Sequence, residues 1–440
     1  LYTFYVLDDN AAGYDFTYLW ESPLLSATYI LLFILLIAGI SRLLSINMKP
    51  GVYSVYSFTY YKKWIKDQMM NLALIVIHPI YATIYAPLYY RLLGAKVGKS
   101  AEISTASDVT HHLLEIGDNS FIADAVILGE HEVRNQELVL EKTTIGNNSF
   151  VGNGGLIPQG YTLADDMLIG VLSKPPTVEQ MTTSPEKDWF GSPPIGLPQR
   201  ERNISFNRSL TFQPPLSKKI ARGLVEAIRI ILPQTLVMIG SVLLIAYVDD
   251  VLETSFFNLV LLLPFYYMAF VALPGFIITI ILKWLLAGKY KPTALPMYSL
   301  KVWLSEAVTT FYEALSVPFL LDQLRGTMWL PLAFRLLGVK TGKRVWLNTT
   351  DITEFDMVSI GDEAMLNEDC GPQTHLFEDR IMKIGTVKIG KQTTIGSRSI
   401  ILYNTIIGDN VSVGSLSLVM KGEELPDNTE WIGSPVKPAG

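Results

Sequence analysis

Apolar residues recur at every sixth position through the second half of the chain, and this period constrains the fold more than any other feature. The series is Ile389, Ile395, Ile401, Ile407, Val413, Val419 and Leu425, and glycine follows at 390, 396, 408 and 414. A shorter series in the first half is Ile145, Val151, Ile157, Leu163 and Ile169. A six-residue period fits neither a helix nor an alternating strand, but it fits a parallel β-helix of triangular section. We therefore expect two such coils, with the glycines serving their tight corners.

The two halves of the chain also repeat one another. The segment RLLGAKVGK (Arg91–Lys99) recurs as RLLGVKTGK (Arg335–Lys343), and KPGVYSVYS (Lys49–Ser57) loosely matches KPTALPMYS (Lys291–Ser299). The offset is 244 positions over most of the coil-forming segments. We predict a tandem duplication in which each copy comprises a membrane helix, interfacial helices and a coil.

Long apolar runs predict membrane helices beside the coils. The chain is 49% hydrophobic and only 17% charged, which is too apolar for a soluble enzyme of 440 residues. Three runs are long enough to cross a bilayer: Leu24–Leu44, Ile228–Val248 and Phe256–Ala287. Two further runs, Asn71–Leu93 and Leu304–Leu337, are interrupted by prolines or acids. We expect these two to be amphipathic or re-entrant segments in the membrane interface.

The distribution of charge predicts the orientation in the membrane. Residues 1–41 contain acids and no Lys or Arg, and the loop 249–255 is also acidic. Basic residues follow the first span and precede the second. The positive-inside rule then places the N-terminus and this loop outside, and both coils on the cytoplasmic side of a bacterial inner membrane.

These features divide the chain into five parts. A span with interfacial helices (residues 1–94) precedes the first coil domain (95–180), a linker (181–222), two further spans with interfacial helices (223–337) and the second coil domain (338–440). The Pro- and Ser-rich segment 176–215 is expected to be an irregular connector. The predicted fold class is therefore membrane α-helices plus two hexapeptide-repeat parallel β-helix domains.

Composition excludes several classes of function. The formal net charge is −6 and no basic, aromatic-interleaved patch occurs, which argues against a nucleic-acid partner. Cys370 is the only cysteine, so the chain has no disulfide framework and no cysteine metal site. The chain begins at Leu1 rather than Met and shows no signal-peptide pattern, so we expect it to be part of a larger protein.

Several motifs resemble those of a known family. They are TDITEFD (Thr350–Asp356), IGD (Ile360–Asp362), QTHLFEDRIMK (Gln373–Lys383) and SLVMKGEELP (Ser417–Pro426), followed by Trp431, Gly433 and Pro435. Together with the tandem units, they resemble the C-terminal membrane region of epsilon-poly-L-lysine synthetase-type nonribosomal peptide synthetases. The coils resemble those of left-handed β-helix acyltransferases, which implies that both coils are left-handed. The resemblance covers nearly the whole chain and is most specific in the second half.

This resemblance implies a membrane-bound transferase that joins amino-acid monomers through isopeptide bonds. The donor would be an aminoacyl thioester on the phosphopantetheine of a carrier domain, and this region would bind no cofactor of its own. Its partners would be the adenylation and carrier domains of the parent synthetase, an amino-acid or oligomer acceptor and the lipid bilayer. An oligomer is also possible, because trimeric relatives place their sites between adjacent coils.

His375 is the strongest catalytic candidate. It lies where the six-residue period is broken between Leu366 and Ile389, so it is expected on an excursion from the coil. Imidazole titrates near neutral pH and suits a general base that takes a proton from an amine. Glu354 and Asp351 are the candidate acids that orient it. A loop histidine without a catalytic role is the alternative.

His131 falls 244 positions before His375, but its neighbours differ. Where the second half has TDITEFD, the first has SDVTHHLLE, with His111 and His112. His131 would belong either to a second active site with altered partners or to a degenerate half that completes the first site. A metal site on these three histidines is disfavoured because their spacing matches no standard zinc motif.

Lys421 and Glu423, in VMKGEELP, lie near the end of the second coil. They are candidates for contact with the carrier protein or its pantetheine, and a solvated surface is the alternative reading. Two rivals to the whole function remain: a membrane acetyltransferase that uses acetyl-CoA, and a non-catalytic scaffold or export module of a synthetase.

Overall fold

The computed structural model of the chain describes residues 17–197, 206–252 and 255–439. It divides into two compact units. Unit 1 contains the residues up to Ile30 together with Leu224–Gly440, and unit 2 is Leu31–Gly223. Each unit contains a three-sided coil of short parallel strands, so the parallel strands that the six-residue period predicts are confirmed. The handedness of the coils, the duplication and the five-part division stay predictions.

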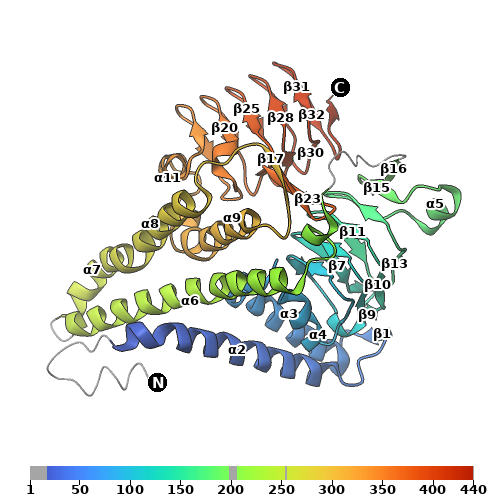
Figure 1. Ribbon diagram of the computed structural model, residues 1–440, viewed down its shortest axis with the longest axis horizontal. Helices are drawn as coiled ribbons and strands as arrows, with labels where there is room; N and C mark the ends of the chain where they lie inside the picture. The colour runs from blue at the N-terminus through green and yellow to red at the C-terminus, as the bar shows by residue number, and fades with distance from the viewer. Residues whose placement is uncertain (1–16, 198–205, 253–254, 440) are drawn as a thin grey trace. The chain divides into compact units, whose positions relative to one another are not determined.

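In unit 1 the coil has three faces, and Figure 1 shows its successive turns. The first face consists of β18 (Lys340–Thr341), β20 (Val358–Ile360), β25 (Val387–Ile389), β28 (Thr405–Ile407) and β31 (Glu424–Leu425). The second consists of β19 (Trp346–Leu347), β21 (Met365–Leu366), β26 (Thr394–Ile395), β29 (Ser412–Val413), β32 (Glu430–Ile432) and the antiparallel β33 (Lys437–Pro438). The third consists of β22 (Gly371–Gln373), β27 (Ile400–Leu402) and β30 (Leu418–Val419).

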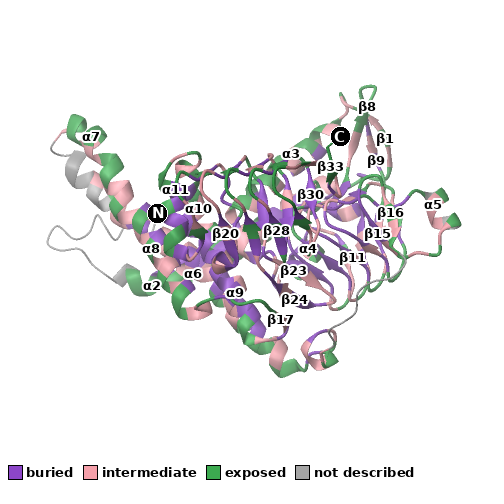
Figure 2. Cartoon of the chain, turned by 90° about the horizontal axis from the view of Figure 1, so that it is seen from above, coloured by how far each residue is buried: buried purple, intermediate pink, exposed green. Residues whose placement is uncertain are grey.

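The six-residue series forms the core of this coil. Ile389 lies opposite Ile407, and Ile407 lies opposite Leu425, so one turn of the coil takes 18 residues. The stacked side chains of the series are at most 3% exposed, and Figure 2 shows the strands of this coil as largely buried. Each turn therefore removes a branched apolar side chain from water on every face, which is the main stabilising contribution to such a coil.

The glycines that follow these residues have a different role from the one expected. Gly361, Gly390 and Gly396 are not among the residues with positive φ, so their positions do not require glycine for its backbone freedom. A Cβ on Gly390 would lie 2.2 Å from the carbonyl oxygen of Gly408 on the next turn. Glycine is needed there because successive turns of backbone approach too closely for any side chain.

An antiparallel hairpin leaves the coil of unit 1. Ile360 pairs with Ile389 across 29 residues instead of 18, and the additional residues form β23 (His375–Glu378) and β24 (Ile381–Ile384). The strand β17 (Thr293–Pro296), which precedes the coil in the sequence, adds to the hairpin as its third strand (Figure 2). The sequence predicted an excursion here, and the structure shows that His375 begins a strand.

Unit 2 has the same three-faced arrangement. Its faces are β2 (Lys96–Val97), β5 (Leu114–Ile116), β10 (Thr143–Ile145) and β13 (Thr162–Leu163); β3 (Glu102–Ile103), β6 (Phe121–Ile122), β11 (Phe150–Val151), β14 (Leu168–Ile169), β15 (Asp188–Phe190) and β16 (Ile195–Leu197); and β4 (Ala106–Ser107), β7 (Val126–Glu130) and β12 (Leu156–Pro158). A hairpin of β8 (Glu132–Arg134) and β9 (Glu137–Leu140) pairs with β1 (Gly51–Ser54).

The described residues of the segment expected to be an irregular connector (176–197 and 206–215) form regular elements in part. It contains α5 (Val178–Thr183), β15, β16 and the short helix η3 (Arg208–Leu210). Trp189 and Phe190 of β15 are buried, and β15 pairs with β14 in parallel. The coil of unit 2 therefore gains another strand from residues that the Pro- and Ser-rich composition concealed.

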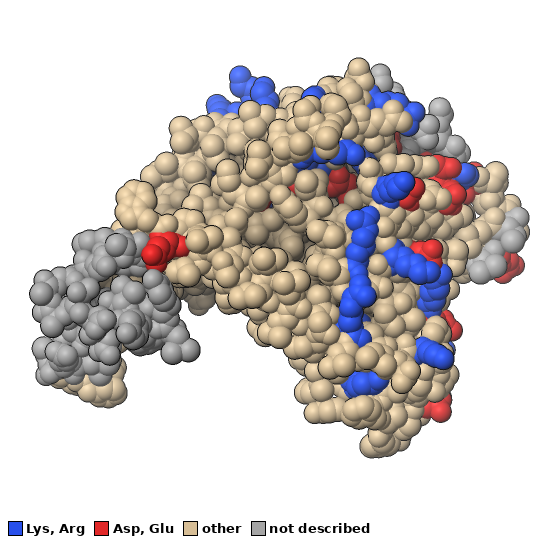
Figure 3. Space-filling view, turned by 60° about the horizontal axis from the view of Figure 1, so that its bottom comes forward, with Lys and Arg blue, Asp and Glu red and all other residues tan. Residues whose placement is uncertain are grey.

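Among the residues that the structure describes, three helices are long and apolar enough to cross a membrane: Leu19–Ser45 in α2 (Thr17–Ser45), Leu216–Ile245 in α6 (Leu216–Leu252) and Phe256–Ala287. The last comprises α7 (Phe256–Tyr267), η4 (Met268–Ala272), α8 (Leu273–Leu282) and η5 (Lys283–Ala287). Many of their large apolar side chains are exposed, such as Leu32, Leu36 and Ile281, which fits association with a membrane. Figure 3 shows one face of the molecule, on which broad areas carry no charged side chain.

Shorter helices lie beside each coil. Unit 2 has α3 (Phe58–Val76), η1 (His78–Ile80), α4 (Ala86–Leu92) and η2 (His111–Leu113). Unit 1 has α9 (Leu300–Phe311), η6 (Tyr312–Ser316), α10 (Val317–Phe319), η7 (Leu321–Leu324), α11 (Trp329–Leu337) and η8 (Phe355–Met357). The acidic residues 1–15 used to predict the orientation, and part of the loop 249–255, lie outside the described residues. The orientation therefore stays a prediction.

Candidate active site

A histidine and a buried carboxylate meet in unit 1. Nδ1 of His375, at the start of β23, lies 2.7 Å from Oε2 of Glu354, which immediately precedes η8. The Glu354 side chain is fully buried, whereas the His375 side chain is 19% exposed. The imidazole is therefore supported from within the protein and still reachable from outside.

Glu354 holds this place in a strained backbone conformation. Its φ of 39° and ψ of 53° lie in the left-handed region, which costs a residue with a Cβ on the order of 1–2 kcal/mol. The hydroxyl groups of Thr374 and Thr353 donate hydrogen bonds of 2.6 and 3.0 Å to Oε2 of Glu354. Strain that the surroundings compensate in this way is a common property of functional sites.

The electrostatics decide which nitrogen of His375 carries the proton. Burial by itself raises the pKa of the Glu354 carboxyl, but the charge and hydrogen bond of His375 and the hydroxyl groups of Thr374 and Thr353 outweigh it, so this pKa lies below its ordinary value. An ionised carboxylate can only accept, so Nδ1 of His375 donates to it. The lone pair of the imidazole is then on Nε2, where it can accept a proton from a substrate.

Elements that precede the coil support the pair. Oγ of Ser305, on α9, lies 3.5 Å from Oε1 of Glu354 and 3.2 Å from the hydroxyl of Tyr290. Two residues after Glu354, Asp356 accepts hydrogen bonds from Nζ of Lys283 (2.7 Å) and from the backbone N–H of Tyr290 (3.1 Å). The loop TDITEFD is thus anchored to the end of an apolar helix.

Of the two acids proposed to orient His375, the structure brings Glu354 onto the imidazole. Asp351 lies beside the next turn of the coil, where a Cβ on Gly371 would be 2.4 Å from its Oδ2. The neighbouring Thr350 accepts a hydrogen bond of 2.5 Å from Tyr312 through its carbonyl oxygen. Asp351 therefore packs against the coil beside Gly371.

Lys421 reaches the hairpin that carries His375. Its Nζ donates to Oε1 of Glu378 at 2.8 Å, and Nζ of Lys383 donates to Oε2 of the same carboxylate at 2.6 Å. Two ammonium groups therefore share one carboxylate. Glu423 instead accepts a backbone hydrogen bond of 2.9 Å from Met420 and closes its own turn.

In unit 2, His131 lies directly before β8 and has different partners. Nζ of Lys63 lies 3.1 Å from its Nδ1 and also contacts Oδ1 of Asp67. Nε2 of His131 lies 3.9 Å from Oδ2 of Asp67. Both Lys63 and Asp67 come from α3, so the acid beside this histidine is on a helix and not on the loop before the coil strand.

The two histidines of SDVTHHLLE, His111 and His112, also contact neighbouring residues. Nδ1 of His112 lies 3.2 Å from Nζ of Lys66, and its Nε2 lies 2.9 Å from the carbonyl oxygen of Met48. His111 is buried, with its ring against Tyr90. Within the described part of the chain, no group of three or more His, Cys, Asp or Glu side chains is arranged to hold a metal ion.

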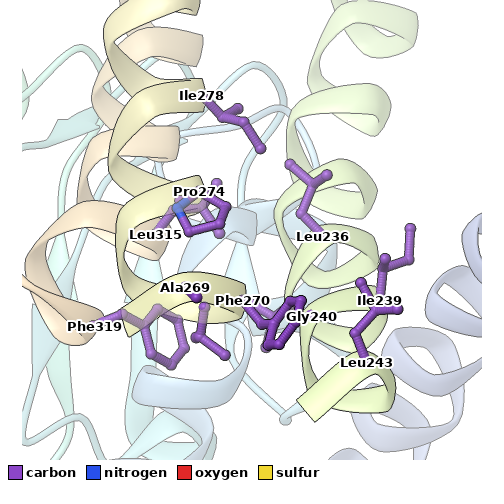
Figure 4. A pocket seen from close by; sticks show the side chains of 13 residues that line it. Leu236, Ile239, Gly240, Leu243, Ala269, Phe270, Pro274, Ile278, Leu315 and Phe319 are labelled. Atoms are coloured by element: carbon purple, nitrogen blue, oxygen red, sulfur yellow. The ribbon is translucent and has the colours of Figure 1, made fainter. Parts of the chain in front are cut away.

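A cavity lies among the apolar helices of unit 1 (Figure 4). It has a volume of about 180 Å³ and is bounded by residues of α6, η4, α8, η6 and α10, including Leu236, Gly240, Phe270, Pro274, Leu315 and Phe319. All of its lining residues are apolar. It therefore offers no acid, base or nucleophile.

Sequence reasoning missed several of these residues. Thr353 and Thr374 flank the two predicted residues, but neither was assigned to Glu354. Lys63 and Lys66 were used only as positive charges near the membrane, and Asp67 was not considered. Lys63, Lys66 and Asp67 are spaced by three and four positions, which places them on one face of α3. Charged residues grouped on one helix face could have indicated that this face contacts the histidines.

The fold and the site define a class of protein: a hexapeptide-repeat coil with apolar helices and a buried carboxylate–histidine pair. No protein-family model matches the chain. Over 418 residues it is 44% identical to the delta-poly-L-ornithine synthetase of Acinetobacter baumannii (strain AB307-0294), a match that covers 94% of this chain and 31% of that protein. The chain thus spans about a third of the length of this curated relative. The resemblance to a poly-amino-acid synthetase is confirmed.

Solved structures similar to the chain include hexapeptide-repeat acetyltransferases. A maltose O-acetyltransferase from Clostridium difficile 630 shares 21% identity and covers 25% of this chain and 73% of its own, with a TM-score of 0.21. A galactoside acetyltransferase in complex with coenzyme A shares 17% identity and covers 25% of this chain and 68% of its own, with a TM-score of 0.22.

Proposed function

We propose that the chain is the bond-forming transferase region of a membrane-bound poly-amino-acid synthetase. The observation that carries this proposal is the His375–Glu354 pair, in which an ionised carboxylate directs the lone pair of the imidazole to Nε2. The 44% identity with a poly-ornithine synthetase supports a basic amino acid as monomer.

In the proposed reaction, the side-chain amine of one monomer or oligomer attacks the carbonyl carbon of an aminoacyl thioester. The C–N bond forms as Nε2 of His375 takes the proton from the attacking nitrogen. Glu354 stabilises the imidazolium through its hydrogen bond to Nδ1–H. The C–S bond then breaks, and His375 returns the proton to the leaving thiolate, so the enzyme ends in its starting state.

The donor thioester would be carried by the phosphopantetheine of a carrier domain, and the monomer would be activated by an adenylation domain of the parent synthetase. Lys421 and Lys383 both donate to the carboxylate of Glu378, so two ammonium groups lie at the far end of the strand that begins with His375. Such charge fits a phosphate group of the donor. Both coils would lie on the cytoplasmic side, where the aminoacyl donor is made.

The test supplies purified protein in lipid nanodiscs with an aminoacyl carrier protein, the free basic amino acid and, separately, acetyl-CoA. We expect amide product from the carrier thioester, and we expect His375→Gln to lower kcat by at least about 100-fold, the usual contribution of a general base. His78→Gln is the matched control, since His78 lies on η1 of unit 2 and outside the site.

The rival functions predict different results. Acetylated amine from acetyl-CoA, with no product from the carrier thioester, would make the chain a membrane acetyltransferase. Full product formation by the His375→Gln protein would refute His375 as the general base. No product from either donor with the wild-type protein would instead favour a scaffold or export module whose chemistry lies elsewhere.

A further inference from the structure

The site around His131 in unit 2 has the opposite hydrogen-bond polarity to the site around His375. Glu354 directly precedes a short helix that leads into a coil strand, and Thr110 has that place in unit 2. The carboxylate is therefore missing at this position, although Asp108, an exposed residue two positions earlier, acts on His131 through its charge. Its nearest replacement is Asp67 on α3, which contacts a lysine as well as facing His131.

Lys63 differs from its counterpart in unit 1, as a comparison of helices α3 and α9 shows. Ser57 precedes α3 and Ser299 precedes α9, and the sixth residue after each is Lys63 and Ser305. Ser305 touches Glu354 in unit 1, whereas Lys63 touches both Asp67 and His131 in unit 2. An uncharged hydroxyl has been replaced by an ammonium group.

That ammonium group determines the protonation of His131. Burial lowers the pKa of Lys63, and the charge and hydrogen bond of Asp67 oppose this shift. An amine in direct contact with a carboxylate stays in its charged form, and an ammonium group can only donate. Nδ1 of His131 therefore accepts, and its proton is on Nε2. Burial, followed by the charge of Lys63, also lowers the pKa of His131, so the ring stays neutral.

A neutral imidazole with Nε2–H presents a donor where His375 presents an acceptor. Nε2 lies 3.9 Å from Oδ2 of Asp67, which is longer than a hydrogen bond, so its proton is available to a further acceptor. Both side chains are about a quarter exposed, at 23% and 25%. A donor and a carboxylate thus stand side by side at an accessible position.

This pair matches one chemical group closely. In an α-aminoacyl group, the carbonyl oxygen and the ammonium nitrogen are carried by adjacent carbon atoms. We propose that unit 2 binds the α-aminoacyl group of a substrate, with Nε2–H of His131 donating to its carbonyl oxygen and Asp67 accepting from its α-ammonium, and that unit 2 supplies no catalytic base. The substrate class rests on the proposed function, whereas the tautomer of His131 follows from Lys63 alone.

The first measurement is independent of catalysis. Selective ¹⁵N labelling of the five histidines in the full chain, with His→Gln variants for assignment, reports the tautomer of each ring. We expect His131 to be protonated on Nε2 and His375 on Nδ1. Lys63→Met removes this donor and should shift the ¹⁵N signal of the acceptor Nδ1 of His131, because that nitrogen then no longer receives the hydrogen bond from Lys63. Protonation of wild-type His131 on Nδ1 overturns the proposal.

The second measurement titrates glycinamide, the smallest amino-acid amide, into the same sample. We expect it to shift the His131 Nε2–H signal, and acetamide (no amine) or ethylamine (no carbonyl) to shift it at least about ten-fold more weakly, because each lacks one contact. Asp67→Asn should reduce the glycinamide effect while the Nε2–H tautomer persists. Equal effects of the three probes, or none from glycinamide, overturn the proposed ligand.

Turnover then separates this inference from the proposed function. His131→Gln should raise KM for the aminoacyl substrate several-fold, with a far smaller loss of kcat than His375→Gln. A His131→Gln protein that folds, shown by an unchanged unfolding temperature, and loses kcat as completely as His375→Gln would make unit 2 a second base site. Glycinamide binding without any transferase activity would instead leave the unit 2 site intact and refute only the proposed reaction.

Discussion

Nζ of Lys283 lies 2.7 Å from Oδ2 of Asp356, which joins the end of an apolar helix to the loop that carries Glu354. Both side chains are buried, at 0% and 6% exposed, and the ammonium group also lies 3.2 Å from the centre of the Trp284 ring. The loop that carries Glu354 is thus held partly by a residue at the end of the apolar helix segment Phe256–Ala287.

Removing one partner of this ion pair should destabilise unit 1. Asp356→Asn leaves the Lys283 ammonium buried without its counter-charge, which typically costs about 3–5 kcal/mol. We expect a lower unfolding temperature and a loss of turnover larger than the loss of folded protein. The control is Glu363→Gln in the exposed pair with Arg344, where solvent screening should keep the cost small. Equal effects of both variants would contradict a positioning role for Lys283.

Glu354→Gln should change the pH dependence of catalysis as well as its rate. An ionised Glu354 favours the charged form of the imidazole, and a neutral amide does not, so the ascending limb of the kcat profile should move to lower pH. We expect kcat to fall at least about ten-fold. Rates from pH 5 to pH 9 check this, with Glu363→Gln again as control. A lower rate with an unshifted profile would mean that Glu354 only shapes the loop.

Gly390→Ala should destabilise the coil of unit 1. A Cβ at this position would lie 2.2 Å from a backbone oxygen of the next turn, which cannot move without displacing the whole strand. Overpacking of this kind typically costs about 1–3 kcal/mol. Gly39→Ala in α2 is the matched control, because no atom lies within 4 Å of its added Cβ. Denaturant unfolding compares the two, and an undisturbed Gly390→Ala protein would refute the close approach.

Lys66 should make the stability of unit 2 rise with pH. Burial, followed by the charge of Lys63, lowers the pKa of Lys66 to about 7. In the unfolded chain the pKa of a lysine is about 10.4. Between these values the unfolded chain binds the additional proton, so the free energy of unfolding increases with pH, by at most about 1.4 kcal/mol per pH unit.

The measurement is urea unfolding from pH 7 to pH 10 of the wild-type protein and of Lys66→Met. The methionine variant lacks the titrating amine, so its stability should rise less over this range. Parallel curves for the two proteins would show that Lys66 keeps its ordinary pKa in the fold.

Lys421→Met tests the cluster beside the His375 hairpin. If its charge contacts the phosphate of the donor, the KM for the carrier thioester should rise several-fold and kcat should change little. Lys388→Met, at an exposed position of β25, is the matched control. The same KM for both variants would mean that Lys421 only holds Glu378 and does not contact the donor.

The six-residue period was enough to predict the coils, because in such a fold local spacing decides which side chains face inward. The same period located the excursion at His375, since an interruption is visible wherever the spacing fails. The three apolar helices followed in the same way from their length and composition. The glycines were found but explained wrongly, because the neighbouring turn of backbone is 18 residues away and leaves no local mark.

The partners of the two histidines were decided by the tertiary structure. Glu354 and Asp351 are both acids of one short loop, and only the left-handed backbone at Glu354 aims that carboxylate at His375. Lys63 precedes His131 by 68 residues and reaches it because α3 packs beside the hairpin of unit 2. Hydrogen-bond polarity depends on which atoms come within about 3 Å of each other. That proximity is a property of packed elements, and a linear sequence does not contain it.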